Sequence, residues 1–235
     1  MLQFKQCVVK RAVELYSIEH IFLEKGQFVA LIGANGVGKS TLFQQLISGE
    51  LKGSVEFDSQ SISTMSSKER AKIVALVDNK FLLTSQITAY DYLQLGRIPH
   101  TGFYGQLKNA DFEIIDRLIE EFKISHLQGK WMHELSDGER QMVSIVRALV
   151  QDTPIILLDE PTAFLDYPRK KDFLQAFQTI AKEKNKLLIM STHDLELAYH
   201  YCDSFLFVNS KEKVLQNITK PESSEVLITN AFPNT

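Results

Sequence analysis

Short apolar runs alternate with helical apolar patterns along most of the chain. Runs of strand length occur at residues 28–32, 73–77, 155–158, 186–190 and 204–208. Patterns that predict helices lie between and after them, near residues 42–47, 139–150, 169–183 and 195–201. A continuous apolar run is typical of a strand buried on both faces. Its alternation with helices predicts an α/β fold with a mostly parallel sheet that helices cover on both sides.

Two parts of the chain depart from this alternation. The first ten residues predict an edge strand, residues 18–23 its partner, and residues 53–57 a further short strand. From about residue 82 to about residue 141 the apolar spacing is helical, which predicts a helical subdomain inserted in the α/β frame. We therefore expect a single domain over residues 1–235. The polar tail from Thr219 predicts no element.

The composition is that of an ordinary globular protein, with 44% apolar and 23% charged residues among 235. The net charge of −3 gives no electrostatic reason to expect a nucleic-acid partner. The two cysteines, Cys7 and Cys202, lie far apart, so they imply no disulfide framework and fit a reducing cytoplasm. Because the longest apolar runs are of strand length, we expect no membrane-crossing segment.

A glycine-rich stretch connects the run at residues 28–32 to the following helix. It consists of Gly33, Ala34, Asn35, Gly36, Val37, Gly38, Lys39, Ser40 and Thr41. Glycines let the backbone curl so that successive N–H groups point at phosphate oxygens, and the helix N-terminus adds a partial positive charge. In such a loop Lys39 would reach the β- and γ-phosphates, and the Ser40 hydroxyl would bind Mg²⁺. A glycine-rich turn could match by chance, but the strand before it and the helix after it favour a nucleotide site.

Two acids, Asp159 and Glu160, end the apolar run at residues 155–158. The carboxyl end of a buried parallel strand is where ligands bind in open α/β sheets. There Asp159 could hold Mg²⁺ opposite Ser40, and Glu160 could polarise the water that attacks a γ-phosphate. The alternative is a pair that only caps the next turn; the phosphate loop upstream favours the catalytic interpretation.

Residues 135–141 predict the start of a helix. Ser136 can cap it, Asp137 and Glu139 suit its first turn, and Gly138 allows close approach. A well-capped helix would explain these residues without any function. The segment also resembles the signature motif of ATP-binding-cassette (ABC) ATPases, Leu-Ser-Gly-Gly-Gln in its usual form, with Asp137 and Glu139 as replacements.

The resemblance to ABC ATPases extends over residues 1–215 and implies a P-loop NTPase (RecA-like) core. Residues 163–166, which end in Asp166, resemble the D-loop after the catalytic glutamate. Residues 191–194 resemble the segment of the switch histidine, and place His193 at a strand end where it could reach a γ-phosphate. A lone histidine is more often structural, and only this context favours a functional one.

The family resemblance also implies partners and a location. A homodimer would form head to tail, with ATP on the phosphate loop of one copy closed over by Ser136, Asp137, Gly138 and Glu139 of the other. The dimer would lie in the cytoplasm, on the inner face of the cell membrane, bound to an integral membrane permease and linked through it to a substrate-binding protein.

Three segments resemble more closely the ATPase subunits of importers for iron–siderophore, haem and cobalamin complexes. They are residues 95–102, 135–141 and 152–166. Two other classes stay open: a soluble ABC ATPase that acts as a switch or assembly factor, for example in iron–sulfur assembly, and a degenerate cassette that binds ATP without useful hydrolysis.

Two positions depart from the family pattern. The glutamine that usually follows the strand at residues 73–77, and that contacts Mg²⁺, is replaced by Asp78, Asn79 and Lys80. We expect Asn79, which keeps an amide, to be the metal contact; Asp78, which would change the charge of the metal site, is the alternative. Arg11 stands where an aromatic residue usually stacks on adenine, and its guanidinium plane could stack instead. A solvated Arg11, with adenine held elsewhere, is the alternative.

Overall fold

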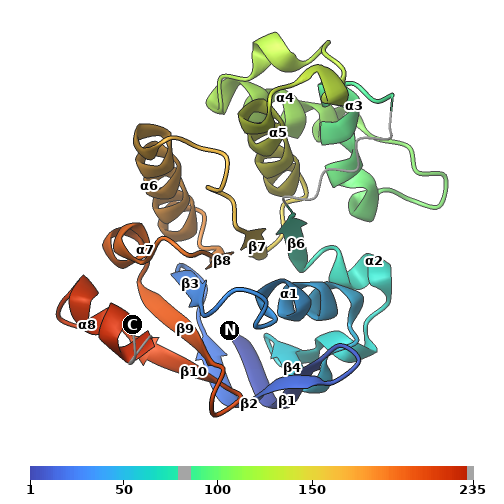
Figure 1. Cartoon of the computed structure of the whole chain (residues 1–235). Coiled ribbons are helices and arrows are strands. Elements are labelled where there is room, and N and C mark those ends of the chain that lie inside the picture. Colours follow the sequence, from blue (N-terminus) through green and yellow to red (C-terminus); the bar gives the residue numbers. More distant parts are fainter. Residues whose placement is uncertain (79–85, 232–235) are drawn as a thin grey trace.

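The computed structural model describes residues 1–78 and 86–231, and its strands form one mixed sheet (Figure 1). The strands are β1 (Leu2–Lys10), β2 (Glu14–Leu23), β3 (Phe28–Ile32), β4 (Lys52–Phe57), β5 (Gln60–Ser61), β6 (Val74–Val77), β7 (Ile155–Asp159), β8 (Leu187–Ser191), β9 (Ser204–Asn209) and β10 (Val214–Thr219). Their order across the sheet is β5-β4-β1-β2-β10-β9-β3-β8-β7-β6.

The helices cover both faces of this sheet. Their bounds are α1 (Lys39–Ser48), α2 (Ser67–Arg70), α3 (Ala89–Gln94), α4 (Asn109–Glu121), α5 (Asp137–Val150), α6 (Tyr167–Glu183), α7 (Leu195–Tyr201) and α8 (Ser224–Ala231). Neither the β10 strand nor α8 was predicted from the sequence pattern. Short 3₁₀ helices lie at Ile62–Thr64, Leu95–His100, Ser125–Leu127 and Met132–Glu134.

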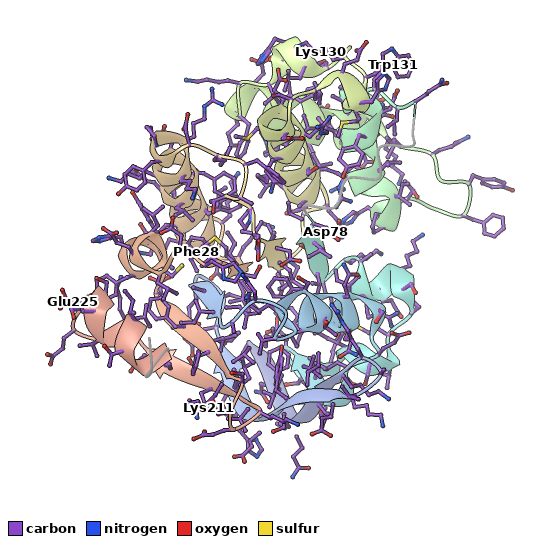
Figure 2. The ribbon with its side chains drawn as sticks, viewed as in Figure 1. Phe28, Asp78, Lys130, Trp131, Lys211 and Glu225 are labelled. Carbon is purple, nitrogen blue, oxygen red and sulfur yellow. The ribbon has the colours of Figure 1, made fainter. Side chains whose placement is uncertain are left out.

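The parallel half of the sheet consists of β9, β3, β8, β7 and β6, each parallel to its neighbour. Side chains alternate between its faces, so that Phe28 packs with α6 on one side while Val29 packs with α1 on the other (Figures 1 and 2). Both faces are therefore apolar, which explains the continuous apolar runs and confirms the predicted α/β class.

The antiparallel half contains β1, which is not an edge strand as the sequence pattern predicted. That prediction is wrong because β4 pairs along one side of β1 and β2 along the other. The β10 strand runs antiparallel to β9 and meets β2 through Val214 and Ser17. This contact joins the N-terminal strands and the parallel strands into one sheet.

The helical region predicted for residues 82–141 corresponds to α3, α4 and the beginning of α5, which project to one side of the sheet (Figure 1). Its predicted start at residue 82 lies outside the described residues. The α5 helix returns from this region to the sheet, where Arg147 Nη2 donates to the Leu76 carbonyl oxygen of β6 at 2.9 Å. The division of the chain into one domain with an inserted subdomain remains a prediction.

Residues 95–100 form a 3₁₀ helix that packs on the end of α5. A Cβ at Gly96 would lie 2.6 Å from the Arg147 carbonyl oxygen, so only glycine allows this approach. Arg97 is buried; its Nε donates to Asp111 Oδ1 at 2.8 Å and its Nη1 to the Val150 carbonyl oxygen at 3.0 Å. This buried ion pair fixes α4 to the segment and to α5.

We expect Asp111→Ala to lower the free energy of unfolding by about 3–5 kcal/mol, because it leaves the Arg97 guanidinium buried without its carboxylate. Chemical denaturation at pH 7 measures this, with Glu113→Ala, an exposed acid on the same helix, as the control. Equal stabilities for the two variants would contradict the expectation.

The same ion pair predicts a pH dependence. The Lys108 backbone N–H and the Arg97 guanidinium hold the pKa of Asp111 below its usual range. A carboxylate with a lowered pKa in the folded state stabilises the protein above its unfolded pKa of about 4 and loses that contribution as the pH falls through the folded value. Denaturation curves between pH 7 and pH 3 should therefore converge for wild type and Asp111→Ala.

Candidate nucleotide-binding site

The site lies where three neighbouring parallel strands end. The glycine-rich loop follows β3, Asp159 and Glu160 end and follow β7, and His193 comes two residues after β8. The β8 strand pairs with both of the others, through Leu31 to Ser191 and through Asp159 to Ser191. Because the carboxyl ends of parallel strands meet at one edge, the sheet brings together residues about 120 to 160 positions apart in the chain.

The loop at residues 33–41 is curled by its glycines. Gly33, Gly36 and Gly38 have φ angles of 151°, 73° and 112°, which side-chain-bearing residues rarely adopt. A Cβ at Gly38 would lie 2.7 Å from Leu15 Cδ1, so the loop packs closely on β2. Ala34, Asn35 and Gly36 are exposed at its tip, and Val37 is half-buried.

The N-terminus of α1 fits an anionic ligand. Gly38 is its N-cap and provides no side-chain hydrogen bond, so the N–H groups of the first turn, which includes Ser40 and Thr41, have no side-chain cap. Such groups and the helix dipole favour a phosphate.

Lys39 is buried beneath this loop with its side chain folded back into it. Its Nζ donates to the carbonyl oxygens of Gly33 at 2.9 Å and Ala34 at 3.2 Å, and lies 3.4 Å from His193 Nε2. Burial lowers the pKa of the Lys39 ammonium, whereas the charges of Glu160 and Asp159 act to raise it. A buried cation hydrogen-bonded to neutral carbonyl groups fits a phosphate oxygen as a further partner.

The two acids differ in their surroundings. Asp159 is buried, and its Oδ1 accepts a hydrogen bond from Ser191 Oγ at 2.6 Å. Glu160 is half-buried, and its Oε1 lies 2.8 Å from His193 Nε2. A neutral imidazole nitrogen either donates or accepts, so in that form Nε2 donates to Glu160 or accepts from Lys39. The shorter distance favours Glu160. The structure thus brings together Lys39, Asp159, Glu160 and His193.

The structure describes two of the three residues predicted to bind metal. Ser40 is half-buried in the first turn of α1, and a hydroxyl with the Asp159 carboxylate gives the hard oxygen donors that Mg²⁺ takes. Asn79 lies outside the described residues. Asp78 precedes it at the end of β6, where the sheet meets the helical region, and its Oδ2 accepts from Gln44 Nε2 at 3.3 Å (Figure 2).

Arg11 lies beside the phosphate loop, as its predicted role requires. Its exposed side chain donates from Nε to Thr41 Oγ1 at 2.8 Å. The contact comes from the turn between β1 and β2. Stacking of its guanidinium on adenine remains a prediction.

The signature-like segment forms the capped start of α5, as its residues predict. Ser136 Oγ accepts from the Glu139 backbone N–H at 3.3 Å, Glu139 Oε2 accepts from the Ser136 N–H at 2.8 Å, and Asp137 pairs with Arg140. With Leu165, the residues Ser136, Gly138 and Glu139 line a cavity of about 620 Å³ between α5 and α6.

This segment is separated from the phosphate loop of the same chain. Among the described residues that line that cavity, none belongs to the loop at residues 33–41. The start of α5 lies in the projecting helical region (Figure 1). Asp166, predicted as part of the D-loop, is the N-cap of α6 and accepts from the Arg169 N–H at 3.0 Å. Within one chain, Ser136 therefore lies away from the cluster around Lys39.

Two buried contacts of the site were not predicted from the sequence. The Ser191 hydroxyl bonds Asp159, and the buried Tyr16 hydroxyl donates to the Gly38 carbonyl oxygen at 3.2 Å. For the first, the sequence offers one signal: Ser191 directly follows the apolar run at residues 186–190, as Asp159 follows the run at residues 155–158. Nothing in the local sequence around Tyr16 indicates the second.

In the part of the chain that the structure describes, helices are too short or too polar to span a bilayer.

Comparison with known proteins identifies the family. The model of the ABC transporter family matches residues 20–163, which include the phosphate loop, residues 135–141 and both acids. An uncharacterized ABC transporter ATP-binding protein of Methanocaldococcus jannaschii is 33% identical over 213 residues, 87% of this chain and 73% of the relative. The iron(3+)-hydroxamate import ATP-binding protein FhuC of Bacillus subtilis is 34% identical over 184 residues, which cover 77% of this chain and 68% of the relative. The ferric enterobactin transport ATP-binding protein FepC of Escherichia coli is 32% identical over 88% of this chain and 77% of the relative.

Solved structures have the same fold. An inward-facing putative metal-chelate type ABC transporter aligns with a TM-score of 0.82 at 24% identity, over 99% of this chain and 88% of the other. CbiO1 of Clostridium perfringens, part of the ABC transporter complex CbiONQ, aligns with a TM-score of 0.79 at 25% identity, over 99% of this chain and 95% of the other. The chain belongs to the ABC transporter family, as one of its ATP-binding, ATP-hydrolysing proteins.

Proposed function

We propose that this ATPase powers import of an iron-chelate, haem or cobalamin-type solute through a separate membrane permease. Hydrolysis is supported by the cluster of Lys39, Asp159, Glu160 and His193 at one edge of the sheet. Import is supported by relatives whose names state it, for iron(3+)-hydroxamate in Bacillus subtilis and petrobactin in Bacillus anthracis. A cobalamin import protein of Halobacterium salinarum, of which the match covers 48%, is 31% identical.

Each residue of the cluster has a role in this proposal. The loop at residues 33–41 and the Lys39 amine hold the phosphates, while Arg11 holds the adenine. Ser40, Asp159 and Asn79 hold Mg²⁺, which when bound neutralises charge on the phosphates. Glu160 orients the attacking water and accepts its proton.

His193 acts next to Glu160 on the γ-phosphate side. Its Nε2 lies 2.8 Å from Glu160 Oε1 and 3.4 Å from the Lys39 amine. An arriving γ-phosphate therefore meets a cation and an imidazole side by side, both able to donate hydrogen bonds to its oxygens when the imidazole carries a proton on Nε2.

The complete site needs two copies in this proposal. Because α5 starts away from its own phosphate loop, Ser136, Asp137, Gly138 and Glu139 would close over ATP bound to the other copy, with Asp166 at the contact between the two sites. ATP then joins the two copies, and its hydrolysis releases them, which shifts the populations of open and closed dimers. The permease, at the inner face of the membrane, would respond to that shift, and a substrate-binding protein would deliver the solute to it.

The transport function is tested by purifying the protein from its native membranes in mild detergent. We expect a polytopic membrane protein in stoichiometric amount. Recovery with soluble partners only would contradict the importer and would favour a switch or assembly factor of the same family.

Lys39→Ala should weaken ATP binding at least tenfold, because it removes the buried cation from the loop. Isothermal titration of ATP without Mg²⁺ measures this directly. Lys52→Ala, which removes an exposed lysine of β4, is the control and should bind ATP as the wild type does. Undiminished affinity in Lys39→Ala would mean that the loop is not the principal site.

Glu160→Gln should slow ATP turnover by about 10²- to 10⁴-fold, because an amide cannot accept the proton of the water. ATP should still drive dimerisation, which size-exclusion chromatography with light scattering detects. Glu196→Gln is the matched control, since Glu196 lines the same groove as Glu160 and is exposed. Wild-type turnover in Glu160→Gln would remove this residue from the mechanism.

A further inference from the structure

One buried hydroxyl connects the two acids of the site. Ser191 is fully buried at the end of β8; its Oγ donates to Asp159 Oδ1 at 2.6 Å and accepts from the Glu160 backbone N–H at 2.9 Å. The directions are fixed by chemistry, because an ionised carboxylate only accepts and a backbone N–H only donates. The hydroxyl thus donates a hydrogen bond to Asp159 and accepts one from Glu160.

The main chain determines where this hydroxyl lies. Ser191 is paired in register with Asp159 of β7 on one side and with Leu31 of β3 on the other. It therefore stands between the strand that ends in the phosphate loop and the strand that ends in the acids. Its backbone is held by the hydrogen-bond ladders on both sides of β8, which restricts where its hydroxyl can lie.

The backbone of Glu160 adopts an unfavourable conformation, which a hydrogen bond to its N–H helps to stabilise. Its φ angle is +47°, in the left-handed region that residues with a side chain rarely adopt. This conformation directs the chain into the turn closed by the Ala163 N–H on the Glu160 carbonyl oxygen at 3.2 Å. In this backbone conformation the Glu160 carboxylate lies beside His193. The Ser191 hydroxyl accepts from the N–H of that strained residue.

We propose that Ser191 is a positioning residue for ATP hydrolysis, which rests on the function proposed above for Asp159 and Glu160. Its hydroxyl orients the Asp159 carboxylate for Mg²⁺ and keeps Glu160 turned toward the attacking water. Ser191 acts through these two acids and does not touch the substrate. Removing the hydroxyl should therefore impair turnover and the use of Mg²⁺ while leaving the binding of ATP by the phosphate loop intact.

The test compares Ser191→Ala with the wild type in three measurements. We expect kcat to fall at least tenfold and the Kd for ATP without Mg²⁺ to stay within twofold. We expect the tightening of a non-hydrolysable ATP analogue by Mg²⁺, measured as a ratio of Kd values, to decrease. Ser191→Thr keeps the hydroxyl and should restore most of the kcat. A kcat and a Mg²⁺ effect equal to those of the wild type would overturn the proposal.

A matched control separates positioning from stability. Thr153 is also fully buried beside β7, and its Oγ1 donates to the Ile155 carbonyl oxygen at 2.7 Å, at the end of the strand away from the acids. Thr153→Val should lower the melting temperature but leave kcat unchanged. If it lowered kcat as much as Ser191→Ala, the effect of Ser191 would be one of general stability and the proposal would fail. Should Ser191→Ala not fold, Ser191→Cys, with a similar size and a weaker donor, carries the same expectation.

A double variant tests whether Ser191 acts through Glu160. Adding Ser191→Ala to Glu160→Gln should slow turnover by a smaller factor than Ser191→Ala slows the wild type, because the part of its effect that acts through Glu160 is already absent and only the part that acts through Asp159 remains. A loss as large as the one in the wild-type background would overturn action through Glu160. If Glu160→Gln alone turned over as the wild type does, the proposed mechanism would fail first; a slow Glu160→Gln with an unaffected Ser191→Ala would refute only the role of Ser191.

Discussion

The parallel pairing of β3, β8 and β7 is the constraint on which the rest of this protein depends. Three segments distant in sequence end at one edge because their strands run side by side in the same direction. The two-sided burial of these strands fixes their register, since a slip of one residue would exchange the side chains that face α1 and α6. Backbone hydrogen bonds therefore fix the points from which the phosphate loop, the acids and the His193 segment start.

The chemistry at that edge is a balance of buried charges. Lys39 is buried with neutral carbonyl partners, and its charge is supported at longer range by Asp159 and Glu160. His193 stands between the cation and Glu160, within hydrogen-bonding distance of both. The negative charge of a polyphosphate can pair with this buried cation and with the N-terminus of α1.

The projecting helices are fixed by a different kind of contact. Arg97 and Asp111 form a buried ion pair that joins the 3₁₀ helix at residues 95–100 to α4, and Arg97 also reaches the end of α5. Residues 95–102 resemble a segment of one class of importer. In this chain the buried Arg97 of that segment has a structural role, because it holds α4 and the end of α5 together. The start of α5, with Ser136 as its cap, is presented by this assembly away from the phosphate loop.

The sequence by itself determined the parallel α/β core, the phosphate loop and the acids after β7, because apolar periodicity and glycine spacing are local and follow directly from backbone geometry. It also determined the cap of α5 through Ser136 and Glu139. Only the tertiary structure decided that β4 covers the first strand and that β10 joins the two halves of the sheet, since strand neighbours depend on contacts between distant segments. It also decided that Ser191 bridges Asp159 and Glu160, because a hydroxyl and two acids some thirty residues apart meet only once β7 and β8 have paired.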